Sequence, residues 1–114
     1  MISIQRKFHK KAGPRRNFMR ILATNFIMRE HIETTETRAR EVRRLVEKLI
    51  TVAKKKRLSD LRLLLQRLPT EAANKLYYEI GPKYTERKGG YTRIIKSGRY
   101  RVRDGSKVAR VEFV

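Results

Sequence analysis

The sequence has 114 residues, no cysteine, and thirty Lys and Arg against eleven Asp and Glu, which gives a formal net charge of +19. The length suits one domain with a modest core, and the absence of cysteine excludes disulfides and thiolate zinc sites. Such a charge indicates an anionic partner. Nucleic acid is the first candidate. An acidic membrane surface is a weaker second candidate, because no apolar run approaches the roughly 18 residues of a membrane span.

Residues 1–14 predict a basic N-terminal arm that precedes a single α+β domain in residues 15–114. The first twenty residues contain no acid, and Gly13 and Pro14 interrupt them. Such a block cannot bury itself and is expected to become ordered on a polyanion, although a solvated tail is the simpler alternative. The overall charge favours an RNA-binding arm. The arm also lacks the apolar core of a secretory signal, so a cytoplasmic protein is expected.

The spacing of apolar residues predicts two helices in the first half of the chain. Phe18, Leu22 and Phe26 recur every four residues and predict a helix over 15–29. Residues 31–35 predict a brief strand or an extended turn, and Thr34 or Thr35 can cap the following helix. That helix, over 36–56, is the clearest element because it carries a single apolar stripe. The stripe consists of Val42, Leu45, Val46, Leu49, Ile50 and Ala53.

Two shorter helices are expected next. Ser59 and Asp60 can cap a third helix that Pro69 stops, and its residues Leu61, Leu64, Leu65 and Leu68 are expected in the core. A fourth helix begins at Thr70 and is expected to end at Gly81 and Pro82. The basic run at residues 54–57 suits the negative end of the second helix dipole, and an RNA contact is an equal alternative.

The last quarter of the chain predicts strands. Residues 91–97 are β-branched at their centre, and residues 107–114 alternate, with Ala109, Val111 and Phe113 on one side. Asp104 and Gly105 mark a turn between them. Two strands joined by a basic loop, with about four helices over one face, predict an α+β fold with a small mixed sheet.

The basic, tyrosine-containing stretch at residues 81–103 is the main candidate for nucleic-acid binding. Interleaved Arg and Lys can neutralise phosphates, and Tyr84, Tyr91 and Tyr100 can each stack on bases or pack in the protein. No helix-turn-helix, homeodomain or finger pattern is present, so recognition of RNA by shape and backbone is favoured. The predicted contacts from the arm and this stretch are Lys7, Lys10, Lys11, Arg15, Lys83, Arg87, Lys88, Arg99, Arg101 and Arg103.

Catalytic chemistry is not expected. His9 and His31 are isolated, and the acids between residues 30 and 47 alternate with basic residues, as in helix-surface pairs. A nuclease Mg²⁺ site needs a few well-oriented carboxylates, which this pattern does not supply. We therefore expect neither a metal nor a cofactor.

Two runs of sequence resemble the bacterial large-subunit ribosomal protein L17 family. They are LYYEIGPKY at residues 76–84 and RKGGYTRIIK at residues 87–96. Upstream, LAT at 22–24, IETT at 32–35, RAREVR at 38–43 and EKLITVAK at 47–54 also match the family. The similarity extends from about residue 14 to residue 114, and the GGYTR run is its most specific part.

This resemblance implies a structural protein without catalytic activity that lies on 23S ribosomal RNA near the mouth of the nascent-peptide tunnel. The expected partners are this RNA and neighbouring large-subunit proteins, with one copy in each ribosome and no membrane. By position, the family residues on or near RNA are Arg16, Arg20, Arg38, Arg43, Tyr91, Thr92, Arg93 and Lys96. The alternative functions are a DNA-binding architectural protein without sequence preference and, less favoured, an RNA-processing enzyme.

Overall fold

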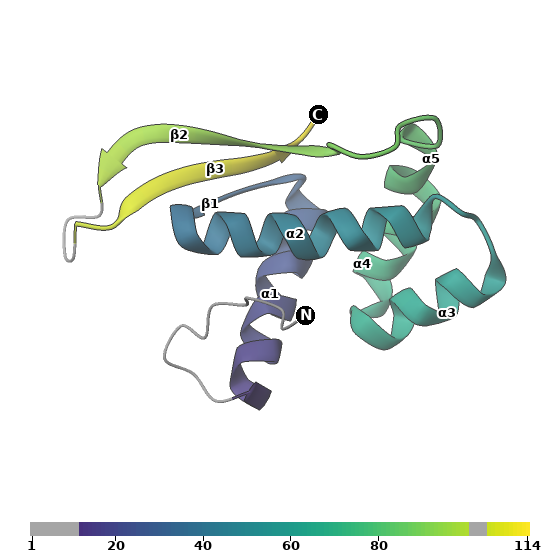
Figure 1. Cartoon of the computed structure of the whole chain (residues 1–114). Coiled ribbons are helices and arrows are strands. Elements are labelled where there is room, and N and C mark those ends of the chain that lie inside the picture. Colours follow the sequence, from purple (N-terminus) through teal and green to yellow (C-terminus); the bar gives the residue numbers. More distant parts are fainter. Residues whose placement is uncertain (1–11, 101–104) are drawn as a thin grey trace, which may run out of the picture.

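The structure is a computed structural model that describes residues 12–100 and 105–114. Its elements follow in chain order, and Figure 1 shows their arrangement. They are α1 (Ala12–Arg29), β1 (His31–Thr35), α2 (Glu36–Ala53), α3 (Leu58–Arg67), α4 (Thr70–Lys75), the π-helical turn η1 (Leu76–Ile80), α5 (Gly81–Lys83), β2 (Thr92–Tyr100) and β3 (Lys107–Phe113). The α+β class predicted from the sequence is confirmed.

The three strands form one sheet in the order β1-β3-β2. Both strand pairs are antiparallel, with Ile32 opposite Val111 in one and Ile94 opposite Val111 in the other. The predicted mixed sheet is therefore wrong in this detail. β2 and β3 form a hairpin, which must be antiparallel, and β1 adds to the free edge of β3 in the direction opposite to β3. The residues at 31–35 are thus a strand and not an extended turn.

The sheet covers α1 and α2 with one face, as Figure 1 shows. Ala109 and Val111 are buried on this inner face, and Phe113 stacks on Phe26 of α1 with ring centroids 4.5 Å apart. The alternation predicted for the last strand is confirmed. The outer face carries charged side chains, among them Arg93, Arg110 and Glu112, and none of the described helices lies against it. The helices and the inner face of the sheet share one hydrophobic core.

Helix α2 runs through the middle of the molecule. Its predicted apolar stripe is buried except for Leu45, which is half-buried. The hydroxyl of Thr35 accepts a hydrogen bond from the Arg38 backbone N–H at 3.4 Å, so Thr35 caps the helix. The helix ends at Ala53, three residues earlier than predicted, because the chain turns and Lys56 adopts a left-handed backbone conformation with φ 60°.

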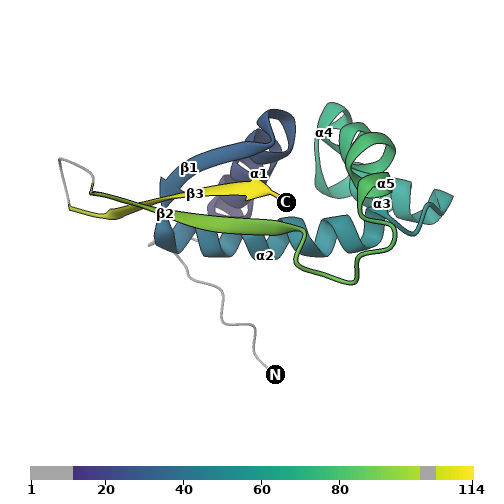
Figure 2. The same cartoon turned by 90° about the horizontal axis from the view of Figure 1, so that it is seen from above.

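Helices α3, α4 and α5 pack together beside the C-terminal half of α2 (Figure 2). Leu64 and Leu68 are buried there, whereas Leu65, predicted in the core, is exposed. Asp60 does not cap α3, because the N-cap position is Arg57, and the Asp60 carboxylate instead accepts a hydrogen bond from Arg57 Nε at 2.9 Å.

The fourth helix does not end at Gly81. The Gly81 N–H donates to the Leu76 carbonyl five residues earlier, and the wide η1 turn carries the helix on to Lys83. Pro82 has no N–H to continue an ordinary helical ladder. Gly81 packs closely against its neighbours, because a Cβ there would lie 3.1 Å from the Leu76 carbonyl oxygen, 3.2 Å from the carbonyl carbon of Ala53 and 3.3 Å from the Cβ of Ala53.

Candidate nucleic-acid interface

A group of basic side chains gathers where the C-terminal end of α2 meets the loop between α5 and β2. In Figure 2 this loop runs beside the C-terminal half of α2 before it enters the sheet. We call this region the junction surface. Its residues are Lys54, Lys55, Lys56, Arg57, Arg87 and Lys88.

Three interactions attach the loop to α2 and its C-cap residue Lys54, and a fourth lies within the loop. Lys54 Nζ donates to the Arg87 carbonyl and lies 5.0 Å from the centroid of the Tyr91 ring. The Tyr91 hydroxyl donates to the same carbonyl at 3.2 Å, and the Tyr91 N–H donates to the Glu47 carboxylate at 2.9 Å. The loop backbone is therefore held at Arg87 and at Tyr91, while the Arg87 and Lys88 side chains remain exposed.

Among the described residues, Arg57 is the only one of the six junction cations in an ion pair. Lys54 donates to the Arg87 carbonyl and Lys56 lies over the Tyr77 and Tyr78 rings, which leaves three cations without either kind of contact. The side-chain charges of Lys55, Arg87 and Lys88 form no ion pair with any residue that the structure describes. Arg57 pairs with Asp60, and the hydrogen bond between them lowers the pKa of the Asp60 carboxyl and raises the pKa of Arg57. Cations that are exposed and unpaired are available to bind phosphates.

Three hairpin cations differ from Lys55, Arg87 and Lys88 because each of the three has a carboxylate within 4 Å. These contacts are Arg93–Glu112 at 3.6 Å, Lys96–Glu36 at 3.8 Å and Arg99–Glu33 at 3.2 Å. The structure thus divides the basic stretch at residues 81–103 into a junction part and a hairpin part. Exposed pairs of this kind contribute little energy, so the hairpin cations can still exchange a carboxylate for a phosphate.

Tyr91 and Thr92 are core residues. Their exposed fractions are 1% and 2%, so their side chains do not reach the surface, and the prediction that they contact RNA is not supported by this fold. Tyr84 is buried beside Tyr91 with ring centroids 5.3 Å apart, and its hydroxyl donates to the Val114 carbonyl at 2.8 Å. Within the GGYTR run, Tyr91 and Thr92 therefore pack in the core at the start of β2, whereas the two glycines and Arg93 are exposed.

Comparison with known proteins matches this chain to one family. The family model for ribosomal protein L17 matches residues 18–114. The chain belongs to the ribosomal protein L17 family. Its location in the cytoplasmic ribosome, expected from the sequence, is confirmed by this membership.

Curated L17 relatives match almost the whole chain. A large ribosomal subunit protein bL17 from Bdellovibrio bacteriovorus is 49% identical over 94% of this chain, and the match spans 59% of that longer protein. The bL17 protein of Natranaerobius thermophilus is 44% identical over 96% of both chains. The bL17 protein of Erythrobacter litoralis is 44% identical over 96% of this chain and 79% of its own length.

Four arginines on α1 and α2 were predicted as RNA contacts from the L17 resemblance, and they differ in their surroundings. Arg16 is exposed. Arg38 lies with its guanidinium carbon 4.8 Å from the Phe18 ring centroid. Arg43 is half-buried, and its Nε is buried without a hydrogen-bond partner in the described part of the chain.

Arg20, the fourth of these L17 positions, is exposed, and its guanidinium forms hydrogen bonds to another part of the chain. Its Nε donates to the Arg67 carbonyl at 2.7 Å, and its Nη2 donates to the Gln66 carbonyl at 2.8 Å. Because these carbonyls end α3, Arg20 satisfies acceptors that the helix leaves open. Its side chain thereby joins α1 to α3.

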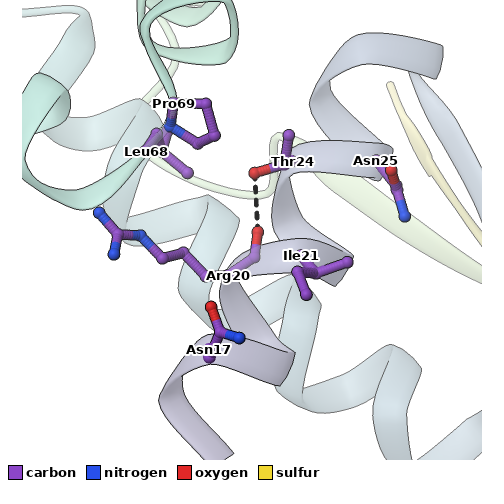
Figure 3. Close-up of a pocket in the computed structure, with 7 residues that line it drawn as sticks. All are labelled: Asn17, Arg20, Ile21, Thr24, Asn25, Leu68 and Pro69. Carbon is purple, nitrogen blue, oxygen red and sulfur yellow. Dashed lines mark hydrogen bonds between the residues drawn. The ribbon is translucent and has the colours of Figure 1, made fainter. Parts of the chain in front are cut away.

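Figure 3 shows the hollow beside Arg20, which has a volume of about 320 Å³. The guanidinium extends along one side of it, towards α3 and Leu68, and the Thr24 hydroxyl donates to the Arg20 carbonyl at 2.7 Å. The lining residues are Asn17, Arg20, Ile21, Thr24, Asn25, Leu68 and Pro69. None of these seven residue types usually acts as a general acid or base near neutral pH, so the hollow beside Arg20 offers no acid–base chemistry.

The remaining predicted contacts are placed as follows. Lys83 is exposed at the end of α5, with its Nζ 3.9 Å from a Glu30 carboxylate oxygen. Arg15 lies in α1, but its side chain is outside the described part. Lys7, Lys10, Lys11, Arg101 and Arg103 also lie outside the described residues.

Tyr78 of this L17 protein is a candidate RNA contact that the sequence patterns did not predict. Tyr78 is 59% exposed, although it follows the buried Tyr77 directly. The available signal was its position on the helix face opposite the apolar stripe, which predicts exposure for a large aromatic residue. Within residues 12–100 and 105–114 no group of three metal-ligating side chains is present, and no helix there is long and apolar enough to cross a membrane.

Proposed function

We propose that this protein is a structural constituent of the large ribosomal subunit that binds 23S rRNA near the exit of the nascent-peptide tunnel. One copy would contact this RNA and neighbouring large-subunit proteins, support subunit assembly, and catalyse no reaction. Membership of the L17 family and the names of the relatives, large ribosomal subunit proteins, support this proposal.

The junction surface is the observation that carries the proposal. Arg87 and Lys88 present unpaired cations on a loop that Glu47 and Lys54 hold in place, and Lys55 presents another just after the end of α2. Fixed cations lose little freedom when they meet phosphates, whereas a mobile basic tail must first become ordered. A held basic surface therefore suits a folded RNA of defined shape.

Recognition is proposed to follow the shape and backbone of the RNA. The junction cations lie on a helix end and a loop and not along one face of a helix, as the contacts of a recognition helix would. Folded RNA is recognised largely through phosphates, 2′-hydroxyls and unpaired bases. The exposed hairpin cations Arg93, Lys96 and Arg99 would add contacts by exchanging their carboxylate partners for phosphates.

The first experiment is a sucrose gradient of cell lysate at moderate and high salt, with the protein followed by mass spectrometry. Near-stoichiometric recovery in the 50S peak at both salt concentrations is expected. Recovery with the nucleoid and absence from the 50S peak would contradict the proposal and favour the alternative of a DNA-binding architectural protein.

A second experiment addresses the RNA and its position. Ultraviolet crosslinking of purified 50S subunits should attach 23S rRNA nucleotides to the peptide that contains Arg87 and Lys88. Mapping of the crosslinked nucleotides should place them around the tunnel exit. Crosslinks confined to 5S rRNA, or to 23S segments remote from the exit, would contradict the proposed position.

A further inference from the structure

The five tyrosines of this chain divide into a buried and an exposed group. Tyr77, Tyr84 and Tyr91 are buried, and Tyr78 and Tyr100 are exposed. An exposed aromatic ring on a strongly basic protein is a feature that stability does not require, because burial would stabilise the fold more. Contacts with other described residues hold the ring of Tyr78.

Tyr78 is held by the η1 turn and by two neighbouring side chains. Its ring meets the Tyr77 ring edge-on, with centroids 4.9 Å apart and an interplanar angle of 85°. Lys56 Nζ lies 5.8 Å from the Tyr78 ring centroid and 5.1 Å from that of Tyr77. The left-handed backbone of Lys56 turns the chain sharply after α2, and the Lys56 ammonium group lies over both rings.

The charges around Tyr78 select the kind of partner. Lys56 lies over the ring, the exposed Lys55 precedes it in the chain, Arg57 is already paired with Asp60, and the exposed Glu79 follows Tyr78 in η1. The lysines outnumber the unpaired carboxylate, so an anionic partner is favoured over an apolar protein surface. An aromatic face beside phosphate-binding lysines is the arrangement that binds unpaired nucleotides.

We propose that Tyr78 is a stacking platform for one unpaired RNA base, with Lys55 and Lys56 binding the phosphates next to that base. This inference rests on the proposed function and adds single-stranded RNA to its target. The base stacks on the open part of the ring, while Tyr77 and Lys56 keep the ring from turning away. Because every base has a π-face, the platform tolerates different bases.

The test uses the full chain, a short oligoadenylate that contains a fluorescent adenine analogue, and an RNA duplex of the same length. Tyr78→Ala is expected to weaken oligoadenylate binding by about 5- to 150-fold, as for other base–aromatic stacks. Tyr78→Phe keeps the ring and should bind within about twofold of the wild type, since stacking needs the π-face and not the hydroxyl. Quenching of the analogue should disappear with Ala and persist with Phe.

Two controls separate stacking from other effects. Leu58→Ala removes an exposed apolar side chain at the start of α3 and should leave oligoadenylate binding unchanged. Tyr78→Ala should leave duplex binding and the salt dependence of binding unchanged, because every phosphate-binding cation is still present. Circular dichroism should show that each variant keeps the thermal midpoint of the wild type.

Three results would overturn the platform. The first is wild-type oligoadenylate affinity in Tyr78→Ala. The second is an equal loss of affinity for oligoadenylate and duplex. The third is unchanged RNA binding with poorer incorporation into 50S particles, which would make Tyr78 a protein contact. The proposed function fails separately, when the wild-type protein is absent from 50S particles.

Discussion

The backbone N–H of Tyr91 donates a hydrogen bond of 2.9 Å to the carboxylate of Glu47, a residue 44 positions earlier in α2. A second carboxylate oxygen lies 3.3 Å from the same nitrogen. This contact fixes the start of β2 against the middle of α2. Because Arg87 and Lys88 lie in the loop just before Tyr91, and residues 54–57 just after α2, it also fixes the two halves of the junction surface relative to each other.

Glu47→Ala should lower the free energy of unfolding by about 1–3 kcal/mol, because it leaves the N–H of a buried residue without its acceptor. Glu47→Gln keeps an acceptor oxygen and should be less destabilising. Urea unfolding measures both changes. Glu86→Ala, which removes an exposed acid from the same loop, is the control and should shift the free energy of unfolding by less than about 0.5 kcal/mol. Equal destabilisation in Glu47→Ala and Glu86→Ala would mean that the Tyr91 contact is not stabilising.

Leu49→Ala should destabilise the protein by roughly 2–5 kcal/mol through a core cavity, since Leu49 is buried in the α2 stripe. Leu58→Ala removes the same atoms from a side chain that is 62% exposed, and it should change the free energy of unfolding by less than about 0.5 kcal/mol. Chemical denaturation compares the pair. A change in Leu49→Ala as small as that in Leu58→Ala would contradict the assignment of the core.

Gly81→Ala should destabilise the protein by about 1–3 kcal/mol, because the new Cβ would press against the end of α2 at Ala53. At Gly89 an added Cβ meets no atom within 4 Å. Gly89→Ala should therefore be neutral or slightly stabilising through the reduced entropy of the unfolded chain. Thermal melts measure the midpoints of the two variants. A Gly81→Ala variant with the midpoint of the wild type would show that α2 and α5 can move apart without cost.

Stability at alkaline pH should report on Tyr84. Burial raises the pKa of its phenol above the ordinary value, and Arg87 partly opposes the shift. The contribution of this group is constant below about pH 10, the pKa of an unfolded tyrosine. It is lost as the pH rises from there through the folded pKa, because the unfolded chain releases the proton first. Urea unfolding from pH 8 upward should give a steeper fall for the wild type than for Tyr84→Phe, and parallel curves would contradict this assignment.

Replacing Lys55, Arg87 and Lys88 with Ala should weaken binding to a 23S rRNA transcript. The slope of log affinity against log salt should become shallower by about one for each phosphate that is no longer neutralised. The matched variant, with Arg93, Lys96 and Arg99 replaced, removes the same charge and should have the smaller effect, because those cations must first leave carboxylate partners. Filter binding over a salt series measures both slopes. The opposite order would place the main contact on the hairpin.

Local sequence patterns predicted the elements well. The stripe of α2 and the alternation of β3 arise from residues close together in the chain, so their periods are visible without a fold. The patterns failed at element ends. Gly81 and Pro82 carry the signals of a helix end, yet the helix continues, because a π turn accommodates Pro82 and Gly81 packs closely against Ala53.

The tyrosines show the same limit at the candidate site. Tyr84 and Tyr91 have basic neighbours in the sequence, which suggested contact with RNA, but both are buried. Tyr78 has the acidic Glu79 beside it and was not marked, but it is exposed and held by Lys56 from another part of the chain. Neighbours in sequence do not report burial when the packing partner lies in a different element.

The sequence by itself determined the charge of +19, the α+β class and the motif runs of the L17 family, because each of these depends on composition or on short-range order. The tertiary structure alone decided which cations stay available. Arg20 donates a hydrogen bond to the carbonyl of Arg67, 47 residues away, and Arg99 donates one to the carboxylate of Glu33, 66 residues away. Lys55 and Lys88 have no such distant partner among the described residues. Pairing over such separations depends on how helices and strands pack, and that packing is set by the whole core and by no single segment.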